Sequence, residues 1–323
     1  MDRRKFVGIA VAALTAAPFD SRGQSTPRVR RIGILTAGSS ASLPSWFFTA
    51  LQDVGWVEGK NLVIERRTAD GRADRMPVLA AELVELRVDA IVTFGAVAGL
   101  AAKKATQTIP IVAVTGDPVA FGLVSNMSHP GGNITGIALI APQLANKRLE
   151  LLRELLPDAT RVGELVDPNN TYWQAVRVDY ERAFRSLRME PLFVVVTSAE
   201  NIESAIAELV RRHAEGLVLR GDPVFGSNRE QIARLAVKHK LPTIAEDRPF
   251  VEAGALVSYG PVAPVLSHRL AVLVDKILRG AAPGDLPIEQ PSKFELLVNL
   301  KTAKALGLAI PQSLRLRADE VIE

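Results

Sequence analysis

Small, hydroxyl-bearing and acidic residues follow three apolar runs in the first half of the chain, at residues 36–40, 94–97 and 115–118. Backbone N–H groups in such short polar loops, together with nearby hydroxyls, can bind an anionic group such as a carboxylate. The candidate ligand-binding residues of this half are Gly38, Ser39, Ser40, Phe94, Gly95, Thr115 and Asp117.

Three comparable loops in the second half, at residues 167–171, 221–225 and 246–248, are richer in carboxylates and amides and include one arginine. Carboxylates favour an ammonium group, so the two halves together suit a small zwitterion. The candidates here are Asn169, Asn170, Asp222, Phe225 and Glu246.

Each candidate also has a structural alternative. Asp117 and Asp222 both precede proline, as turn residues often do. Phe94 and Phe225 either stack on a ligand or belong to the core.

The sequence offers little for catalysis. It has no cysteine, which excludes thiolate nucleophiles, disulfides and zinc–cysteine sites. Nucleotide-binding, hydrolase and metalloprotease motifs are absent, and the four histidines are isolated. We therefore expect no enzyme activity, no metal and no cofactor. Lys147 and Arg148, close to Glu150 and Glu154, are expected to form a solvated helix face.

Composition places the chain among globular proteins, with 323 residues, 48% of them hydrophobic and 23% charged. That length predicts about two domains. The net charge of +4 is spread along the chain and not gathered in a patch, so we expect no nucleic-acid partner. A monomer is the expected oligomeric state.

The first 23 residues are typical of an export signal. A basic segment at residues 2–6 precedes an apolar stretch at 7–19, which is too short to span a bilayer. Small residues follow at positions 21 and 23, as a signal peptidase requires. Arg3 and Arg4, followed by Phe6, resemble a twin-arginine signal, although Asp2 stands where a hydroxyl residue is usual. The absence of cysteine excludes a lipid anchor, so a free periplasmic protein is expected.

The polar loops need a scaffold that brings them together, and the rest of the chain alternates between strand and helix patterns. Buried or alternating strands are predicted at residues 31–36, 61–67, 89–94, 109–114, 133–139, 161–166, 192–196, 216–219, 243–245 and 293–299. Helices are predicted at 43–54, 76–86, 97–106, 146–156, 171–187, 199–213, 228–239, 262–278 and 302–306.

This alternation predicts an α/β fold with two doubly wound parallel-sheet lobes joined by a multi-strand hinge. The predicted first lobe comprises residues 24–142 and 259–285, and the second comprises 143–258 and 286–323. The crossings are expected at 258–261 and 284–287. Because ligands of open parallel sheets lie beyond the carboxyl ends of the strands, the polar loops should meet between the lobes.

Seven segments carry a resemblance to a known family. They are RIGIL at 31–35, GWVEGKNLVIE at 55–65, DPVAFGLV at 117–124, PGGNITG at 130–136, FVEAG at 250–254, SYGP at 258–261 and KFELLVNLKTAKALG at 293–307. In their sequences, in their order along the chain and in how closely they follow one another, these segments resemble the ABC-transporter substrate-binding proteins of the tryptophan/tyrosine type. The resemblance covers the chain from about residue 31 to its end.

The resemblance implies a type I periplasmic binding-protein fold whose two lobes close about a three-strand hinge. It further implies the periplasmic solute-binding component of an ABC importer, with a small amino-acid-like ligand, aromatic ones included, and a permease partner in the inner membrane. The same candidate residues map onto the family's pocket, but Glu246, Asp247 and Arg248 stand where relatives have a small or hydroxyl residue. A solute receptor for a sensor protein is the alternative, and an enzyme acting in the same inter-lobe site is a weaker one.

Overall fold

A parallel sheet of five strands organises the first lobe, in the order β2-β1-β3-β4-β5. The computed structural model describes residues 29–38, 43, 45–139, 142–168, 171–220 and 222–323, so the predicted export signal lies outside the described residues. The strands are β1 (Arg30–Thr36), β2 (Leu62–Thr68), β3 (Ala90–Phe94), β4 (Ile111–Thr115) and β5 (Ile134–Ala138). The inner strands are continuous apolar runs because helices cover both of their faces.

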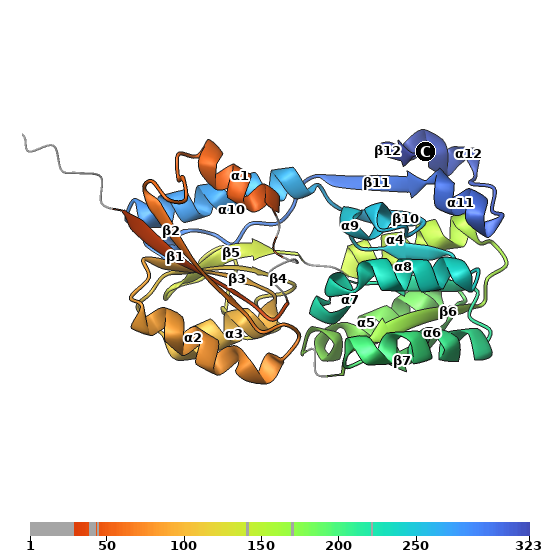
Figure 1. Cartoon of the computed structure of the whole chain (residues 1–323), viewed down its shortest axis with the longest axis horizontal. Coiled ribbons are helices and arrows are strands. Elements are labelled where there is room, and N and C mark those ends of the chain that lie inside the picture. The colour runs from red at the N-terminus through yellow and green to blue at the C-terminus, as the bar shows by residue number, and fades with distance from the viewer. Residues whose placement is uncertain (1–28, 39–42, 44, 140–141, 169–170, 221) are drawn as a thin grey trace, which may run out of the picture.

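Two core clusters lie on the two faces of this sheet (Figure 1). On one face pack α2 (Met76–Glu85) and α3 (Ala96–Ala105), with the 3₁₀ turn η2 (Ala73–Arg75) before α2. On the other face α1 (Ser45–Asp53) packs beside α10 (Ala263–Leu278), a helix from late in the chain. The first lobe is therefore completed by a distant segment.

A sheet of seven strands organises the second lobe, in the order β12-β11-β10-β9-β8-β6-β7. Its strands are β6 (Arg161–Val166), β7 (Glu190–Val195), β8 (Gly216–Leu219), β9 (Thr243–Ala245), β10 (Val257–Pro261), β11 (Phe294–Asn299) and β12 (Glu320–Ile322). All neighbouring pairs are parallel except β10 and β11, which run antiparallel.

Helices again cover both faces. One face carries α4 (Pro142–Leu155), α5 (Thr171–Ser186), α11 (Leu300–Leu306) and α12 (Gln312–Arg317). The other carries α6 (Ile202–Arg211) after the turn η3 (Ala199–Asn201), then α7 (Pro223–Ser227), α8 (Arg229–Lys238) and α9 (Arg248–Glu252). The α/β prediction with two doubly wound lobes is confirmed.

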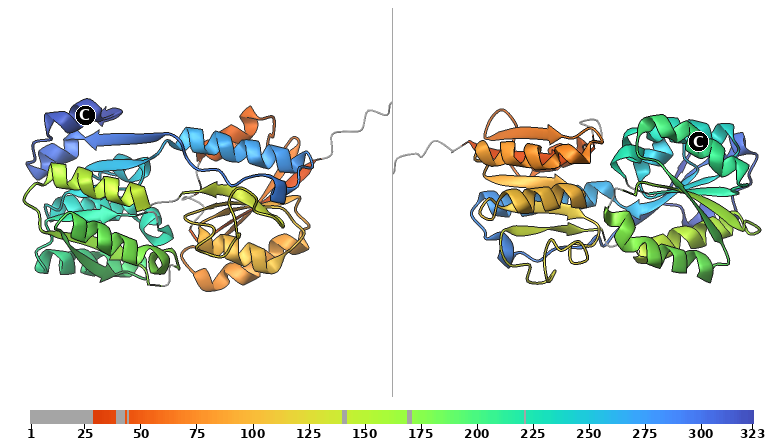
Figure 2. Two further views of the ribbon diagram at one scale, coloured as in Figure 1. Left: turned by 180° about the vertical axis from the view of Figure 1, so that it is seen from behind. Right: turned by 90° about the horizontal axis from the view of Figure 1, so that it is seen from below.

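The chain passes between the two sheets three times (Figures 1 and 2). It leaves the first sheet after β5, returns between β10 and α10, and enters the second sheet for good at β11. Residues 258–261, predicted as a crossing, are most of strand β10. The segment 284–287, also predicted to cross, contains the end of the turn η4 (Pro283–Asp285) and still lies on the first lobe, where Thr135 Oγ1 donates to the Leu286 carbonyl at 2.8 Å.

Ile288 then packs in the first lobe's core, and the Ala138 N–H donates to the carbonyl of Glu289. The precise residues that divide the lobes stay a prediction.

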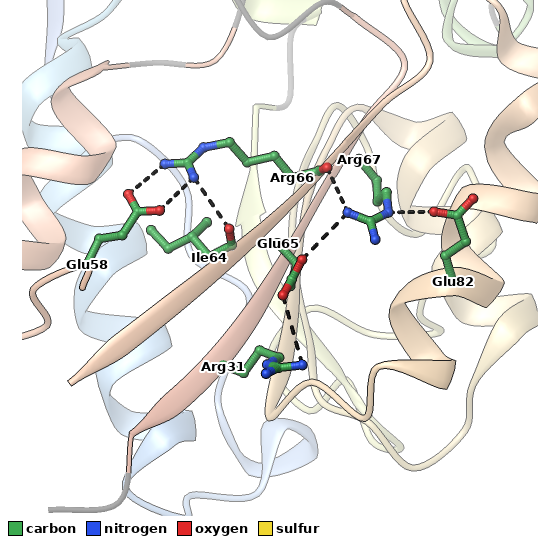
Figure 3. A network of polar contacts seen from close by, with 7 residues as sticks. All are labelled: Arg31, Glu58, Ile64, Glu65, Arg66, Arg67 and Glu82. Atoms are coloured by element: carbon green, nitrogen blue, oxygen red, sulfur yellow. Dashed lines mark hydrogen bonds and ion pairs between the residues drawn. The ribbon is translucent and has the colours of Figure 1, made fainter. Parts of the chain in front are cut away.

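Charged side chains line β2, an edge strand of the first sheet (Figure 3). Arg66 binds Glu58 at 2.7 Å, and Arg67 binds Glu82 at 2.6 Å and Glu65 at 3.7 Å. Charges on an edge strand oppose pairing with a strand of another molecule. We therefore assign this network the role of protecting the edge strand.

Candidate functional site

The two sheets share a strand order that fixes where a ligand is expected. In each, the first strand of the series lies between the second and the third, as in β2-β1-β3 and β7-β6-β8. The connections that lead to the strands on its two sides run in opposite directions. In such sheets, ligands bind where these connections separate, at the carboxyl ends of the strands. By this rule a ligand is expected at the carboxyl ends of β1 and β3 in the first lobe and of β6 and β8 in the second.

These two carboxyl edges come together between the lobes. Helix α3 follows β3 and helix α5 follows β6, and the two helices contact each other (Figure 1). The ends of the two lobes that carry these helices are therefore next to each other.

In the first lobe, Gly38, Gly95 and Thr115 lie at this edge. The Gly38 N–H donates to Thr36 Oγ1 at 3.1 Å, and Gly95, with a φ of 92°, begins α3. The Thr115 hydroxyl is buried and has no hydrogen-bond partner among the described residues. A buried hydroxyl of this kind is available to a ligand or a water molecule.

Two other predicted residues of the first lobe have clear local roles. Phe94 is half-buried and meets the Phe47 ring edge-on, with centroids 5.9 Å apart. Asp117 Oδ1 accepts hydrogen bonds from the N–H groups of Val119 and Ala120 at 2.9 and 3.0 Å. Asp117 therefore fits its turn alternative.

In the second lobe, Asp222 and Phe225 also fit their structural alternatives. Asp222 Oδ1 accepts from the Val224 N–H at 2.8 Å and caps α7. Phe225 is 1% exposed and packs in the core under α6 and α8. Four predicted residues, Ser39, Ser40, Asn169 and Asn170, lie outside the described residues.

Glu246 follows β9 and faces Arg148 of α4, with Oε1 3.6 Å from Nη2. Arg148 is only 1% exposed, and its Nε donates to the Tyr259 carbonyl of β10 at 2.8 Å. The predicted solvated face is therefore wrong for Arg148, because α4 turns this position inward onto β9 and β10. Arg248, which shares the Glu246 loop, instead binds Glu295 at 2.7 Å and Glu320 at 2.8 Å.

A buried ion pair that the sequence did not single out lies beside Glu246. Glu164, in β6, is fully buried and contacts the Nε of Arg220, which directly follows β8 and is 5% exposed. The Arg220 guanidinium carbon lies 4.5 Å from the Trp173 ring centroid and 5.0 Å from that of Tyr180. We call Arg148, Glu164, Tyr180, Arg220 and Glu246 the buried charge cluster.

Burial sets the protonation behaviour of this cluster. It raises the pKa of Glu164 against the opposing effect of Arg220. It likewise raises the pKa of Tyr180, so the phenol stays neutral. For Asp247, next in the chain after Glu246, burial and then the Glu246 charge raise the pKa to about 6.

One signal in the sequence pointed to this cluster. Glu164 interrupts the apolar strand 161–166, and a charge in a strand that is buried on both faces needs a partner. Nothing local identifies that partner as Arg220, which lies 56 positions later.

Two other features do not contribute to the site. Within the ranges described, no cluster of three or more potential metal-binding side chains occurs. A groove of about 500 Å³ lies beside α11, lined by Leu300, Ala303, Lys304, residues 307–310 and Arg315. Helix α11, which borders this groove, is at the end of the second lobe away from the first lobe (Figure 1).

Comparison with known proteins gives consistent matches. A sequence model of the family described as "ABC transporter substrate binding protein" matches residues 34–322. A curated tyrosine-binding protein of Clostridioides difficile (strain R20291) is 28% identical over 265 residues, which cover 81% of this chain and 75% of that protein.

Solved structures agree in fold. A Streptococcus pneumoniae ABC domain in complex with L-Trp superposes with a TM-score of 0.82 at 23% identity and covers 91% of this chain and 99% of its own. A leucine-binding protein, LivK, of Thermotoga maritima gives a TM-score of 0.57 at 14% identity, covering 78% and 83%.

Proposed function

The chain belongs to the ABC transporter substrate binding protein family and has a type I periplasmic binding-protein fold, and from this premise we propose which solute it captures and where. The solute is a small amino acid, with the aromatic ones as first candidates. It binds between the two lobes, which close on it, and it is delivered to an ABC permease.

The observation that carries this proposal is the buried charge cluster at the carboxyl edge of the second sheet. Arg148 and Arg220 supply positive charge, and Glu164 and Glu246 supply negative charge, next to the crevice between β6 and β8. A free amino acid carries both charges and can interact with both kinds of group. The tyrosine-binding relative and the L-Trp complex support an aromatic side chain.

Among the predicted site residues, Gly38, Phe94, Gly95, Thr115 and Glu246 form the proposed ligand contacts. Asp117, Asp222 and Phe225 hold the loops that carry these contacts, through the turn, the helix cap and the core packing described above.

The proposed setting is the periplasm. The predicted twin-arginine signal would export the protein, which then acts as an unanchored monomer beside a permease of the inner membrane. It binds no nucleic acid and catalyses no reaction. Among the described helices none combines the length and the hydrophobicity that a bilayer crossing requires.

The function is tested by ligand screening. The purified protein is unfolded and refolded to remove bound solute, then heated with each L-amino acid, with tyramine and with simple sugars. A ligand at a hundredfold excess over its Kd stabilises the fold by about 2.7 kcal/mol, which a thermal scan detects. Stabilisation by L-tyrosine or L-tryptophan is expected. If no amino acid stabilised the protein, the proposed solute class would be wrong.

A further inference from the structure

We propose that the groove beside α11 is a docking site for a protein partner, which places in it an acidic segment that also carries apolar side chains. The groove is formed by the second lobe alone, so this role is separate from solute capture between the lobes.

The lining of the groove is largely apolar. Leu300, Leu308 and Ile310 pack against the core of the second lobe with part of their surface and also border the groove. Ala303 and Ala309 complete the apolar lining. The volume of about 500 Å³ is in the range of sites that hold a small ligand. Apolar surface that is rimmed by polar residues is typical of interaction sites.

The charges of the segment that forms the groove are all of one sign. Residues 300–318, which contain α11 and α12, have four basic residues and no acidic one. Lys304 and Arg315 line the groove, Lys301 precedes them on α11, and all three are exposed. Within the described part of the chain, none of these three side chains has an ion pair. A partner that carries negative charge is therefore favoured.

The surroundings do not neutralise these charges. Glu154 of α4 is occupied by Arg317, the fourth cation of the segment. Asp319 Oδ2 accepts from the Leu296 N–H at 2.8 Å. Lys240 adds a further positive charge, because its Nζ donates to a carbonyl of α11. The groove therefore combines an apolar lining with an excess of positive charge.

The shape of the site favours a peptide segment over a membrane surface. A bilayer surface is flat on this scale, whereas an apolar groove receives the side chains of a helix or an extended chain. Leu316, next to Arg315, is 78% exposed and extends the apolar surface on α12. Because α11 and α12 lie at the end of the second lobe away from the first lobe, closure of the lobes does not cover the groove (Figure 1).

The experiment measures the fluorescence anisotropy of labelled synthetic peptides mixed with the purified protein. The first probe is a short peptide of Glu, Leu and Ala with its leucines on one face of a helix. In the second probe Lys replaces each Glu, and in the third Ser replaces each Leu. The first probe should bind at least about tenfold more tightly than either of the others, since each exposed ion pair contributes a factor of up to about five. Equal binding of the first two probes, or no binding of the first, would overturn the proposal.

Variants test whether the groove is the site. Lys304→Glu combined with Arg315→Glu should weaken binding of the acidic probe at least about tenfold, because two attractions become repulsions. Ala309→Trp fills the groove, keeps both cations and should also weaken binding. Lys60→Glu combined with Lys276→Glu makes the same charge change on the first lobe and should alter the affinity by less than about twofold. All five positions are exposed, so the variants should fold. Wild-type affinity in the groove double variant or in Ala309→Trp would show that the peptide binds elsewhere.

Two other occupants of the groove are outcomes that would overturn the proposal. Vesicles of phosphatidylglycerol that bind the protein through Lys304 and Arg315, when the acidic peptide does not bind, would make the groove part of a membrane-contact surface. A dimer that forms at high concentration in analytical ultracentrifugation, and that disappears in the Lys304→Glu, Arg315→Glu double variant, would make a second copy of the chain the occupant.

Discussion

Among the charged side chains of this protein, the buried ones and the exposed ones differ in what they contribute to stability. Pairs such as Arg177 with Glu181 on α5 lie in solvent, where an ion pair stabilises a fold by at most about 1 kcal/mol. Glu164 and Arg220, in contrast, are almost completely covered, so each is tolerated only because of the other.

We therefore expect Arg220→Met to lower the free energy of unfolding by about 3–5 kcal/mol, because Glu164 keeps its burial and loses its partner. The double variant with Glu164→Leu should recover most of this loss. Urea denaturation at neutral pH measures both, with Arg177→Met as the exposed control, expected to change stability by less than about 1 kcal/mol. Equal losses in the single and double variants would show that the pair is not coupled.

Asp247 gives the protein a pH dependence of definite sign. Its pKa is raised from 3.8 to about 6, chiefly by burial and next by Glu246, while Arg148 and Arg229 act in the opposite direction. Between these pH values the folded state holds the proton that the unfolded chain releases, so Asp247 makes stability fall as the pH rises through this window.

Asp247→Asn should remove this slope and raise stability at pH 7 by on the order of 1–2 kcal/mol. Chemical denaturation at several pH values from 4 to 7 tests it, with the exposed Asp74→Asn as control. A variant whose pH profile overlays that of the wild-type protein would rule out this role of Asp247.

At this scale the sequence predicted the positions of the loops better than the surroundings of individual side chains. Thr115 and Glu246 lie at the ends of strands, as predicted. Arg148, in contrast, was predicted to be on the surface because Lys147 and Glu150 near it are charged. Helical neighbours one position apart face different directions, so the partly exposed Lys147 says nothing about Arg148. Partnerships such as Glu164 with Arg220 depend on strand order, which no local pattern contains.

Among the elements, β10 is under a tight backbone constraint at Gly260. A Cβ atom on Gly260 would lie 1.9 Å from the carbonyl oxygen of Glu246, so the strand can approach the Glu246 loop only with glycine there. Gly260→Ala is expected to lower the melting temperature by several degrees and to weaken ligand binding, because Glu246 must shift. Gly226→Ala in α7, with nothing within 4 Å of its added Cβ, is the matched control and should fold normally.

Helix α10 is attached to the first lobe by a specific bond. Trp56 Nε1 donates to Asp275 Oδ1 at 2.9 Å, an oxygen that also accepts from Arg279 Nε. Trp56→Phe should cost about 1 kcal/mol of unfolding free energy, the worth of one hydrogen bond, in urea titrations. Asp275→Asn keeps an acceptor and should cost less; a larger loss there would favour the charge of Asp275 over its hydrogen bond.

The elements themselves were largely predictable. The strands 161–166, 216–219 and 243–245 have the predicted bounds, because each is a short apolar run between turn residues. Helices α7 and α9 were missed, since five residues are too few to show a helical period. Residues 258–261 were predicted as a crossing between the lobes and not as a strand, but they belong to strand β10. Glycine and proline are tolerated there because the strand leaves the sheet at these residues.

For the whole molecule, the proposed capture mechanism predicts a change of shape. Two lobes connected by three passages of the chain can rotate about them, and a ligand that contacts both lobes favours the closed arrangement. Small-angle scattering should show a smaller radius of gyration with saturating L-tyrosine or L-tryptophan than without it. An unchanged profile, at a concentration where calorimetry shows full occupancy, would exclude closure as the response.

Because α10 comes late in the sequence, it also affects how the chain folds during synthesis. Trp56 meets Asp275 across 219 positions of sequence, and the face of the first sheet that carries Phe47 is covered in part by Leu270 and Val274. As the chain emerges from the ribosome, this lobe stays unfinished until α10 has been synthesised, and the second lobe then still awaits β11 and β12. Neither half is complete until most of the chain has been made, so a nascent chain stalled before residue 263 would expose an apolar sheet face to chaperones and proteases.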